Sequence, residues 1–430
     1  MQFESSASFA QRMDADDPLA AFQDQFHMPL DQKGQKCIYL CGNSLGLQPK
    51  SVRESIEQEL QDWQTFGVEG HFHAKNTWMR YHELLAEPMA RLVGAKPLEV
   101  VVMNTLTVNL HLLMVSFYRP TAKRYKILIE ASAFPSDQYA VKSQLHFHGY
   151  HPDDALIEVQ PDDGQAWIST EKIEAVLAQQ GHEIALVLLG GVNYYSGQAF
   201  DMARITAAAH AQGCVVGFDL AHAAGNVMLH LHDWQVDFAV WCSYKYLNAG
   251  PGSTAGCFVH ERHANAVDLP RFAGWWGHDK ATRFKMGPDF QPIAGAEGWQ
   301  LSNPAILPLA ALRASMAIFD EAGMANLCAK SEKLTGYLEF LIEQIGGDAV
   351  ESITPKQPEA RGAQLSLRLA RDGKAVFDRL SARGVVCDWR EPDVIRIAPV
   401  PLYNSFTDVY RFVEIMKEEM HGLGRNFRRS

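Results

Sequence analysis

Two polar residues with complementary chemistry lie at the ends of neighbouring strand-like runs in the middle of the chain. Asp219 ends the run CVVGFDL, and Lys245 lies just past the run DFAVWC. A desolvated lysine amine can lose its charge and form a Schiff base. An aspartate beside a pyridine nitrogen keeps that nitrogen protonated. The pair predicts a pyridoxal 5′-phosphate site, with Lys245 and Asp219 as catalytic residues.

The surroundings of Lys245 favour this interpretation over two unrelated strand-end residues. Lys245 lies in the uncharged run SYKYLNAGPG, where a lysine that only solvates a surface is not expected. Gly250 and Gly252 would let the backbone pass close to a bound group. His222 follows Asp219 by three residues, so we expect it to hydrogen-bond or orient that aspartate.

Two further segments could complete the site. Thr105 and Thr107 precede or begin the apolar helical run VNLHLLMVSFY, whose free N–H groups could bind a phosphate. A threonine that simply caps the helix is the alternative. In the loop AFPSDQ, Phe134 could stack on the pyridine ring, and Asp137 is either an acid near the ring or a helix cap.

Composition narrows the classes of partner and compartment. The formal charge of -11 disfavours nucleic acid and anionic membranes as partners. The start of the chain has no apolar core of a secretory signal, and the run Ile184–Leu189 is far too short to span a bilayer. The seven cysteines have no zinc-site spacing and indicate reduced thiols. We therefore expect a cytoplasmic protein without membrane contact.

Several His-x-His pairs raise the question of a metal ion. They occur at 71–73, 146–148 and 230–232, where both rings would lie on one face of a strand. Neither a carboxylate nor a cysteine accompanies them in the sequence as the further ligand that zinc requires. We expect no metal ion.

Alternating strand and helix patterns run through the middle of the chain. Apolar runs such as YKILIEA, IALVLLGGV and CVVGFDL alternate with amphipathic ones such as STEKIEAVLAQQG and ARITAAAHAQG. This pattern predicts an α/β fold with a mostly parallel sheet between helices. We expect residues 1–100 to be an N-terminal segment packing with a small domain, residues 101–308 to be a large cofactor-binding domain, and residues 309–430 to be a long helix and a small α+β domain.

Longer motifs make the chain resemble the kynureninase family of aminotransferase-like (fold type I) pyridoxal-phosphate enzymes. The likeness covers most of the chain. The motifs that carry it are LCGNSLGLQPK, NTLTVNLHLL, FPSD, GFDLAHAAGN, WCSYKYLNAGPG, GWWGH, TRFKMGP, LSNPAIL and IRIAPVPLYNS.

The resemblance implies a role for each matching residue. Lys245 would carry the Schiff base, with Tyr244 a proton source beside it, and Arg396 would bind the α-carboxylate of the substrate. The residues implied around the cofactor are Leu106, Thr107, Phe134, Asp137, Asp219, His222, Tyr244, Trp275 and Asn303. Gly190 departs from the family, because other members can have a serine there. Family members are homodimers with shared active sites, which makes Trp275 and Asn303 the expected cross-subunit residues.

The resemblance also implies a reaction, the hydrolysis of L-kynurenine or 3-hydroxy-L-kynurenine in tryptophan degradation or NAD biosynthesis. His71, Ser302 and Asn303 match positions that line the aryl pocket. All three can bond a 3-hydroxyl group, so we expect 3-hydroxykynurenine to be the preferred substrate.

Two alternatives share the fold. A cysteine desulfurase or an aminotransferase would also use Lys245 and Asp219, although a desulfurase needs an exposed nucleophilic cysteine in a flexible loop. A non-catalytic ligand sensor would usually carry an added basic DNA-binding segment. The chain shows neither feature.

Overall fold

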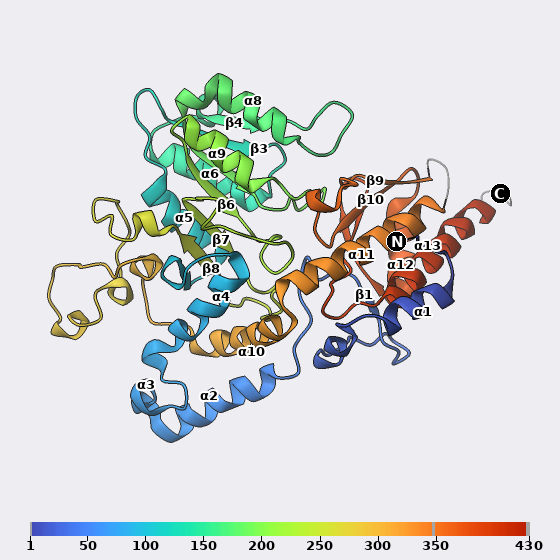
Figure 1. The fold of residues 1–430 in the computed structure, drawn as a ribbon, viewed down its shortest axis with the longest axis horizontal. Helices are drawn as coiled ribbons and strands as arrows, with labels where there is room; N and C mark the ends of the chain where they lie inside the picture. The colour runs from blue at the N-terminus through green and yellow to red at the C-terminus, as the bar shows by residue number, and fades with distance from the viewer. Residues whose placement is uncertain (1, 346–348, 427–430) are drawn as a thin grey trace.

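The architecture is taken from a computed structural model that describes residues 2–345 and 349–426, with side chains described as far as residue 420. A seven-stranded sheet forms its centre, in the order β2-β8-β7-β6-β5-β3-β4 (Figure 1). Neighbouring strands are parallel from β7 to β4, and β8 is antiparallel to both β2 and β7. The strands are β2 (Val100–Val102), β3 (Lys126–Glu130), β4 (Leu156–Val159), β5 (Ile184–Gly190), β6 (Val215–Asp219), β7 (Phe238–Trp241) and β8 (Gly256–Val259).

The expected α/β fold with a mostly parallel sheet is confirmed. Strands such as β5 are buried along nearly their whole length, as the continuous apolar runs predicted. The helices that follow the strands in sequence form layers around the sheet, and two apolar cores fill the space between. These helices are α5 (Leu106–Phe117), α6 (Pro135–Phe147), α7 (Pro152–Ala155), α8 (Thr170–Gln180) and α9 (Met202–Ala211).

A smaller unit lies to one side of the sheet and carries its own core (Figure 1). Its antiparallel sheet has the order β12-β13-β10-β9, and a separate parallel pair joins β1 to β11. Its strands are β1 (Ile38–Tyr39), β9 (Val350–Ser352), β10 (Leu365–Leu369), β11 (Val385–Val386), β12 (Asp388–Arg390) and β13 (Val394–Ile397). Its helices are α1 (Ala7–Ala15), α12 (Gly373–Ala382) and α13 (Phe406–Asn426), while α10 (Ile306–Ala322) and α11 (Met324–Glu343) link it to the sheet.

The N-terminal 100 residues divide between the two units instead of packing only with the small one. Helix α1 and strand β1 belong to the small unit, where α1 contacts α13. Helix α2 (Val52–Phe66) contacts α10, and α4 (Ala86–Val93) contacts α10 and β2. The short helix α3 (Gly70–His73) lies between them in sequence. The apolar face of α4 matches the large core, which sequence position alone did not reveal. The expected boundaries at residues 100 and 308 stay a prediction.

Helix α2 buries two acidic residues and exposes a tryptophan. Glu59 and Asp62 are buried, whereas Trp63 is 62% exposed. Trp78 Nε1 donates to Glu59 and the backbone N–H of Lys75 donates to Asp62, so hydrogen bonds hold both carboxylates inward. The apolar residues in the second half of this helix are therefore turned outward, whereas Val52 near its start is buried. Within the described residues, no helix is both long and apolar enough to cross a membrane.

Candidate active site

The ends of three adjacent parallel strands bring the predicted site together. Glu130 ends β3, Gly190 ends β5 and Asp219 ends β6, and the Cα atoms of Gly190 and Asp219 are paired in register. Lys245 lies four residues beyond the end of β7, the next strand in the sheet. Ligands of open α/β sheets bind at such carboxyl ends, where loops supply the functional side chains.

The Lys245 amine has a hydrogen-bonded and aromatic environment. Its Nζ lies 3.1 Å from Nε2 of His222, 5.7 Å from the centre of the Phe134 ring and 5.9 Å from that of Tyr244. An ammonium only donates, so His222 accepts through Nε2. Burial, followed by the charge of Lys245, lowers the pKa of His222 well below its usual value, which keeps the ring neutral. His222 thus contacts Lys245, and no described hydrogen bond joins it to Asp219 as the sequence had suggested.

Asp137 and Asp219 form a pair of buried carboxyls. Asp137 lies in the first turn of α6, and its side chain hydrogen-bonds Asp219. Burial is the main cause that raises the pKa of Asp137 well above its ordinary value, so it carries the shared proton. Burial also raises the pKa of Asp219, while the N–H of Ala221 (N···Oδ1 2.7 Å) and Lys245 lower it. Asp137 is therefore an acid of the site and not the cap of α6.

The first turns of α5 and α6 lie together beside this pair. Thr107 Oγ1 lies 2.9 Å from Ser136 Oγ, which joins the two helix ends. Thr105 is the residue before α5, and its side chain makes no capping hydrogen bond. The alternative of a simple threonine cap is thus not what the structure shows. The N–H groups of the first turn, which includes Leu106 and Thr107, are left for another acceptor, and an anion suits them.

Arg396 comes from β13 of the small unit and is almost fully buried. Its guanidinium donates to the carbonyl oxygen of Tyr194 at 2.8 Å and forms an ion pair with Asp388. Its Nε has no described partner. Burial lowers the pKa of Arg396 to about 10. Arg396 is among the charges that lower the pKa of His222, which places it on the site side of the small unit.

The expected aryl-pocket and cross-subunit residues lie apart from Lys245 in a single chain. Trp275 Nε1 donates to Asn303 Oδ1 at 3.1 Å, so these two are brought together. Ser302 is exposed, and His71 Nδ1 bonds the carbonyl oxygen of Val68. No described hydrogen bond, ion pair or ring contact links His71, Trp275, Ser302 or Asn303 to Lys245.

Two functional-site residues were missed by the sequence reasoning. Glu130 is buried, and its carboxyl accepts a hydrogen bond from the N–H of Gly190 at 3.2 Å. Tyr194 packs edge-on against Phe134, with ring centres 5.2 Å apart, and its carbonyl binds Arg396. Both follow the rule that residues at strand ends face the ligand. That rule, applied to every strand and not only to β6 and β7, would have found them.

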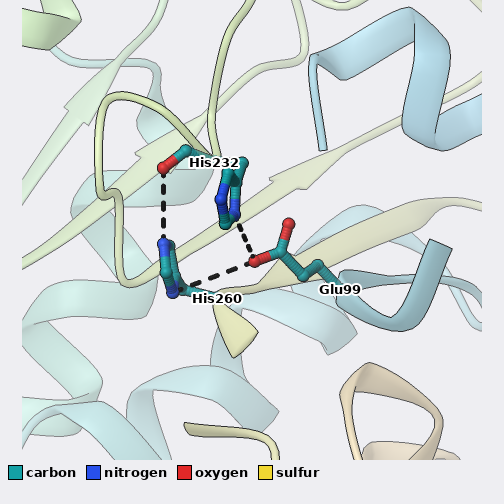
Figure 2. Close-up of side chains that lie close together, drawn as sticks. All are labelled: Glu99, His232 and His260. Carbon is teal, nitrogen blue, oxygen red and sulfur yellow. Dashed lines mark hydrogen bonds and ion pairs between the residues drawn. The ribbon is translucent and has the colours of Figure 1, made fainter. Parts of the chain in front are cut away.

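A carboxylate does accompany one His-x-His pair, contrary to the sequence reasoning. Figure 2 shows Glu99 beside the rings of His232 and His260. Glu99 Oε1 accepts from His232 Nδ1 at 2.9 Å and from the N–H of Glu261 at 2.8 Å. Nδ1 of His260 accepts from the N–H of Arg262, and its Nε2 bonds the carbonyl oxygen of His232. These atoms already have hydrogen-bond partners, so the cluster connects neighbouring loops of the protein and does not need a metal ion to satisfy it.

A second group, around His82, contains two carboxylates. Lys280 Nζ lies 2.8 Å from Glu83 and 2.7 Å from Glu297, where a cation between the two carboxylates would sit. The lysine therefore already supplies the positive charge. The expectation of no metal ion stays a prediction.

The chain is similar to known proteins along nearly its whole length. A family model described as the kynureninase C-terminal domain matches residues 327–416. A protein named kynureninase from Koribacter versatilis is 63% identical over 412 residues, covering 96% of this chain and 97% of that protein. One of the same name from Myxococcus xanthus is 61% identical over 415 residues, covering 96% and 97%.

Solved structures share the fold at low identity. A cysteine desulfurase from Thermococcus onnurineus NA1 has a TM-score of 0.76 at 17% identity, covering 96% of this chain and 98% of that chain. The Escherichia coli cysteine desulfurase CsdA has a TM-score of 0.75 at 16% identity, covering 94% and 98%. This likeness shows the fold alone and confirms the fold type I architecture. The identity to the curated relatives, over nearly the full length of both chains, shows that the protein belongs to the kynureninase family.

Proposed function

We propose that this chain is a pyridoxal-phosphate-dependent hydrolase that cleaves the Cβ–Cγ bond of L-kynurenine or 3-hydroxy-L-kynurenine. The products are L-alanine and the matching anthranilate. The observation that carries the proposal is the Lys245 amine held 3.1 Å from a neutral His222, on a sheet edge that also presents the Asp137–Asp219 acid pair. Family membership supplies the substrate class.

The residues present fit the cofactor. Asp137 Oδ1 and His222 Nδ1 are buried polar atoms without a described partner, which indicates that a polar ligand belongs beside them. The uncapped first turn of α5 suits a phosphate, and Phe134, 41% exposed, offers a ring face for stacking. Lys245 would hold the aldehyde carbon. When bound, the cofactor supplies an electron sink for bond breaking at the substrate carbons.

Each residue of the chain has a distinct task in the proposed reaction. Lys245 is placed to take the proton from the α-carbon of the substrate, with its amine directed by His222. Asp219 would keep the ring nitrogen of the bound cofactor protonated, and the proton on Asp137 reduces repulsion between the two acids. Burial raises the pKa of Tyr244, so its phenol keeps a proton that it can donate to the leaving carbon. Water must add to the γ-carbonyl carbon before the Cβ–Cγ bond breaks.

Arg396 would bind the α-carboxylate of the substrate. Its fork already contacts Asp388 and the carbonyl oxygen of Tyr194, and its unpartnered Nε is the donor left for a further acceptor. A planar guanidinium suits a carboxylate because it can donate two parallel hydrogen bonds. Asp388 would hold the arginine in place before the substrate arrives.

The direct test of the activity is a product assay. The purified chain, loaded with pyridoxal phosphate, is incubated with each kynurenine, and L-alanine and the anthranilate are quantified by chromatography. We expect equal amounts of the two products, because one bond cleavage makes one of each. Formation of neither product would overturn the proposal, and an oxo acid in place of alanine would indicate an aminotransferase.

We also propose that 3-hydroxykynurenine is preferred, through His71, Ser302 and Asn303. Each offers a group that can bond the hydroxyl, and an unpaired buried polar group costs about 1–3 kcal/mol. kcat/KM should therefore be higher for 3-hydroxykynurenine than for kynurenine. The double variant His71→Trp, Asn303→Thr should reduce the ratio of these two kcat/KM values. A wild-type preference for kynurenine, or an unchanged ratio in the double variant, would contradict the pocket assignment.

We propose further that the chain acts as a homodimer with shared active sites. Two exposed apolar regions support this. One region comprises the end of α2 and the residues after it, where Trp63 is 62% and Val68 is 74% exposed. The other is the loop containing Met286, which is 73% exposed. Lys280 in that loop bonds Glu83 near the first region, so the two are joined. Large exposed apolar surfaces of this kind mark protein interfaces. His71 and Trp275 lie within these regions.

A cysteine desulfurase is the alternative that the shared fold raises, and the cysteines disfavour it. A nucleophilic cysteine needs a lowered pKa and an exposed sulfur. Burial is the largest cause raising the pKa of every cysteine in this chain: Cys37, Cys41, Cys214, Cys242, Cys257, Cys328 and Cys387. All seven are free thiols, which suits a reducing compartment, so we place the enzyme in the cytoplasm, in tryptophan degradation or NAD biosynthesis.

A further inference from the structure

Glu130 is a buried carboxyl that the proposed reaction does not use. It ends β3 and is 4% exposed. Its two oxygens lie 3.2 and 3.3 Å from the backbone nitrogen of Gly190, which donates to them. No basic side chain among the described residues pairs with it. A buried carboxyl held by backbone donors alone, without a basic partner, is costly, so its retention at a ligand-binding edge calls for a role.

The contact with Gly190 shows where the Glu130 carboxyl lies. Gly190 and Asp219 are paired in register on parallel strands, so a side chain on Gly190 would project to the same face as that of Asp219. A Cβ added to Gly190 would lie 3.0 Å from Glu130 Oε1. The Glu130 carboxyl thus lies against the position that a side chain at residue 190 would take, close enough to Asp219 for the charge of that residue to act on it.

The charges around Glu130 cannot all be present at once. Asp137 from α6 and Asp219 from β6 are its acidic neighbours. Lys245 is the cation that acts on both of these acids, and His222, which contacts Lys245, is neutral. Three close carboxyls with one amine cannot all ionise without large repulsion. Burial, with the charge of Asp219 adding to it, raises the pKa of Glu130 to about 7. The charge at this strand end therefore changes near neutral pH.

We propose that Glu130 is a positioning residue that acts through Asp219, supplying a second negative charge behind the acid that faces the cofactor ring nitrogen. The inference rests on the proposed function, because it requires pyridoxal phosphate at this edge. A protonated ring nitrogen favours the ionised form of Glu130 by Coulomb attraction. Binding of the cofactor therefore releases the proton of Glu130, and cofactor affinity gains from this residue as the pH rises.

The test is the dissociation constant of pyridoxal phosphate over about pH 6 to pH 8.5 for wild type and Glu130→Gln. Glutamine keeps an oxygen to accept from Gly190 but carries no charge. The ratio of the variant constant to the wild-type constant should be near one at the acid end and rise about tenfold at the alkaline end, since one pKa unit is a factor of ten. Glu158→Gln is the matched control, because Glu158 lies exposed on the adjacent strand β4, and its ratio should stay near one.

Thermal unfolding of the full chain without cofactor shows whether Glu130 titrates as described. Its pKa is raised on folding, so its contribution to stability is lost as pH rises from the ordinary glutamate value to about 7. Glu130→Gln should therefore raise Tm relative to wild type at pH 8.5 more than at pH 5. A Tm difference independent of pH would overturn the proposal. So would a pH-dependent Tm difference with a flat ratio of dissociation constants, because Glu130 would then be structural only.

Gly190→Ala tests the same arrangement from the other side. Its methyl group would lie 3.0 Å from Glu130 Oε1, so that carboxyl must shift by a few tenths of an ångström. We expect Gly190→Ala to bind the cofactor more weakly near pH 8.5. The double variant Gly190→Ala, Glu130→Gln should have nearly the same dissociation constant as Glu130→Gln alone. Full additivity of the two changes would contradict the contact. Because the readouts are binding and unfolding, a chain that binds cofactor but does not cleave kynurenine would refute only the proposed activity.

Discussion

At the scale of single residues, the most specific consequence concerns the acid pair. Asp219→Ala should reduce turnover by orders of magnitude, because the ring nitrogen loses the carboxylate that keeps it protonated. Asp219→Glu should be less harmful, since the charge is kept and only displaced. Steady-state kinetics with saturating cofactor would measure both. An alanine variant with near-normal turnover would remove Asp219 from the proposed mechanism.

The sequence identified the residues that carry the most distinctive chemistry and missed those that act by position. Lys245 and Asp219 stood out because a lysine and an acid are unusual beside buried strands, and the structure places Asp137 and Phe134 around them. Glu130 looked like an ordinary strand residue in YKILIEA. Its carboxyl accepts from the N–H of Gly190, sixty residues away along the chain but adjacent across the sheet. Such a contact follows from strand order, which one sequence does not give.

At the scale of elements, the first turn of α5 carries the proposed phosphate site. Thr107→Val removes a hydroxyl that contacts Ser136 while keeping the shape of the side chain. The dissociation constant for pyridoxal phosphate should rise at least about tenfold, a loss of roughly 1.5–3 kcal/mol for a hydrogen bond to a charged group. The constant for pyridoxal, which lacks the phosphate, should change little. Equal losses for both compounds would show that Thr107 acts elsewhere.

Strands were predicted better than helix faces, for a physical reason. Runs such as IALVLLGGV are buried on both sides in a parallel sheet, so their position needs no knowledge of a partner. The apolar residues of α2 also indicated a helix correctly. They did not indicate which side is buried, because Glu59 and Asp62 face inward and find partners at Trp78 and Lys75. Buried charges satisfied by distant residues are not visible in local periodicity.

At the scale of the whole molecule, the shared active site has a quantitative test. Lys245→Ala and Trp275→Ala dimers, each inactive or nearly so, are mixed and allowed to exchange subunits. If Trp275 serves the site of the partner subunit, each mixed dimer regains one intact site, and about a quarter of the wild-type activity should return. Trp63→Glu, on the exposed face of α2, should shift the chain toward monomer in light scattering. Phe147→Glu, at the end of α6 and 74% exposed, is its control.

No recovery on mixing, with subunit exchange verified, would place Trp275 in the site of its own chain. Trp63→Glu without effect on molecular mass would exclude that face as the interface. The sequence predicted shared sites only through the family resemblance, and within the described residues of one chain no hydrogen bond, ion pair or ring contact joins His71 or Asn303 to Lys245.

The account depends most on Lys245 being the residue that holds the cofactor beside His222 and the acid pair. The measurement that tests it most directly is reduction of the cofactor-loaded protein with borohydride, followed by digestion and mass-spectrometric mapping of the modified lysine. The account predicts one stoichiometric adduct, on the peptide containing Lys245, and only reversible cofactor binding by Lys245→Ala. An adduct on another lysine, or none in the wild-type protein, would contradict it.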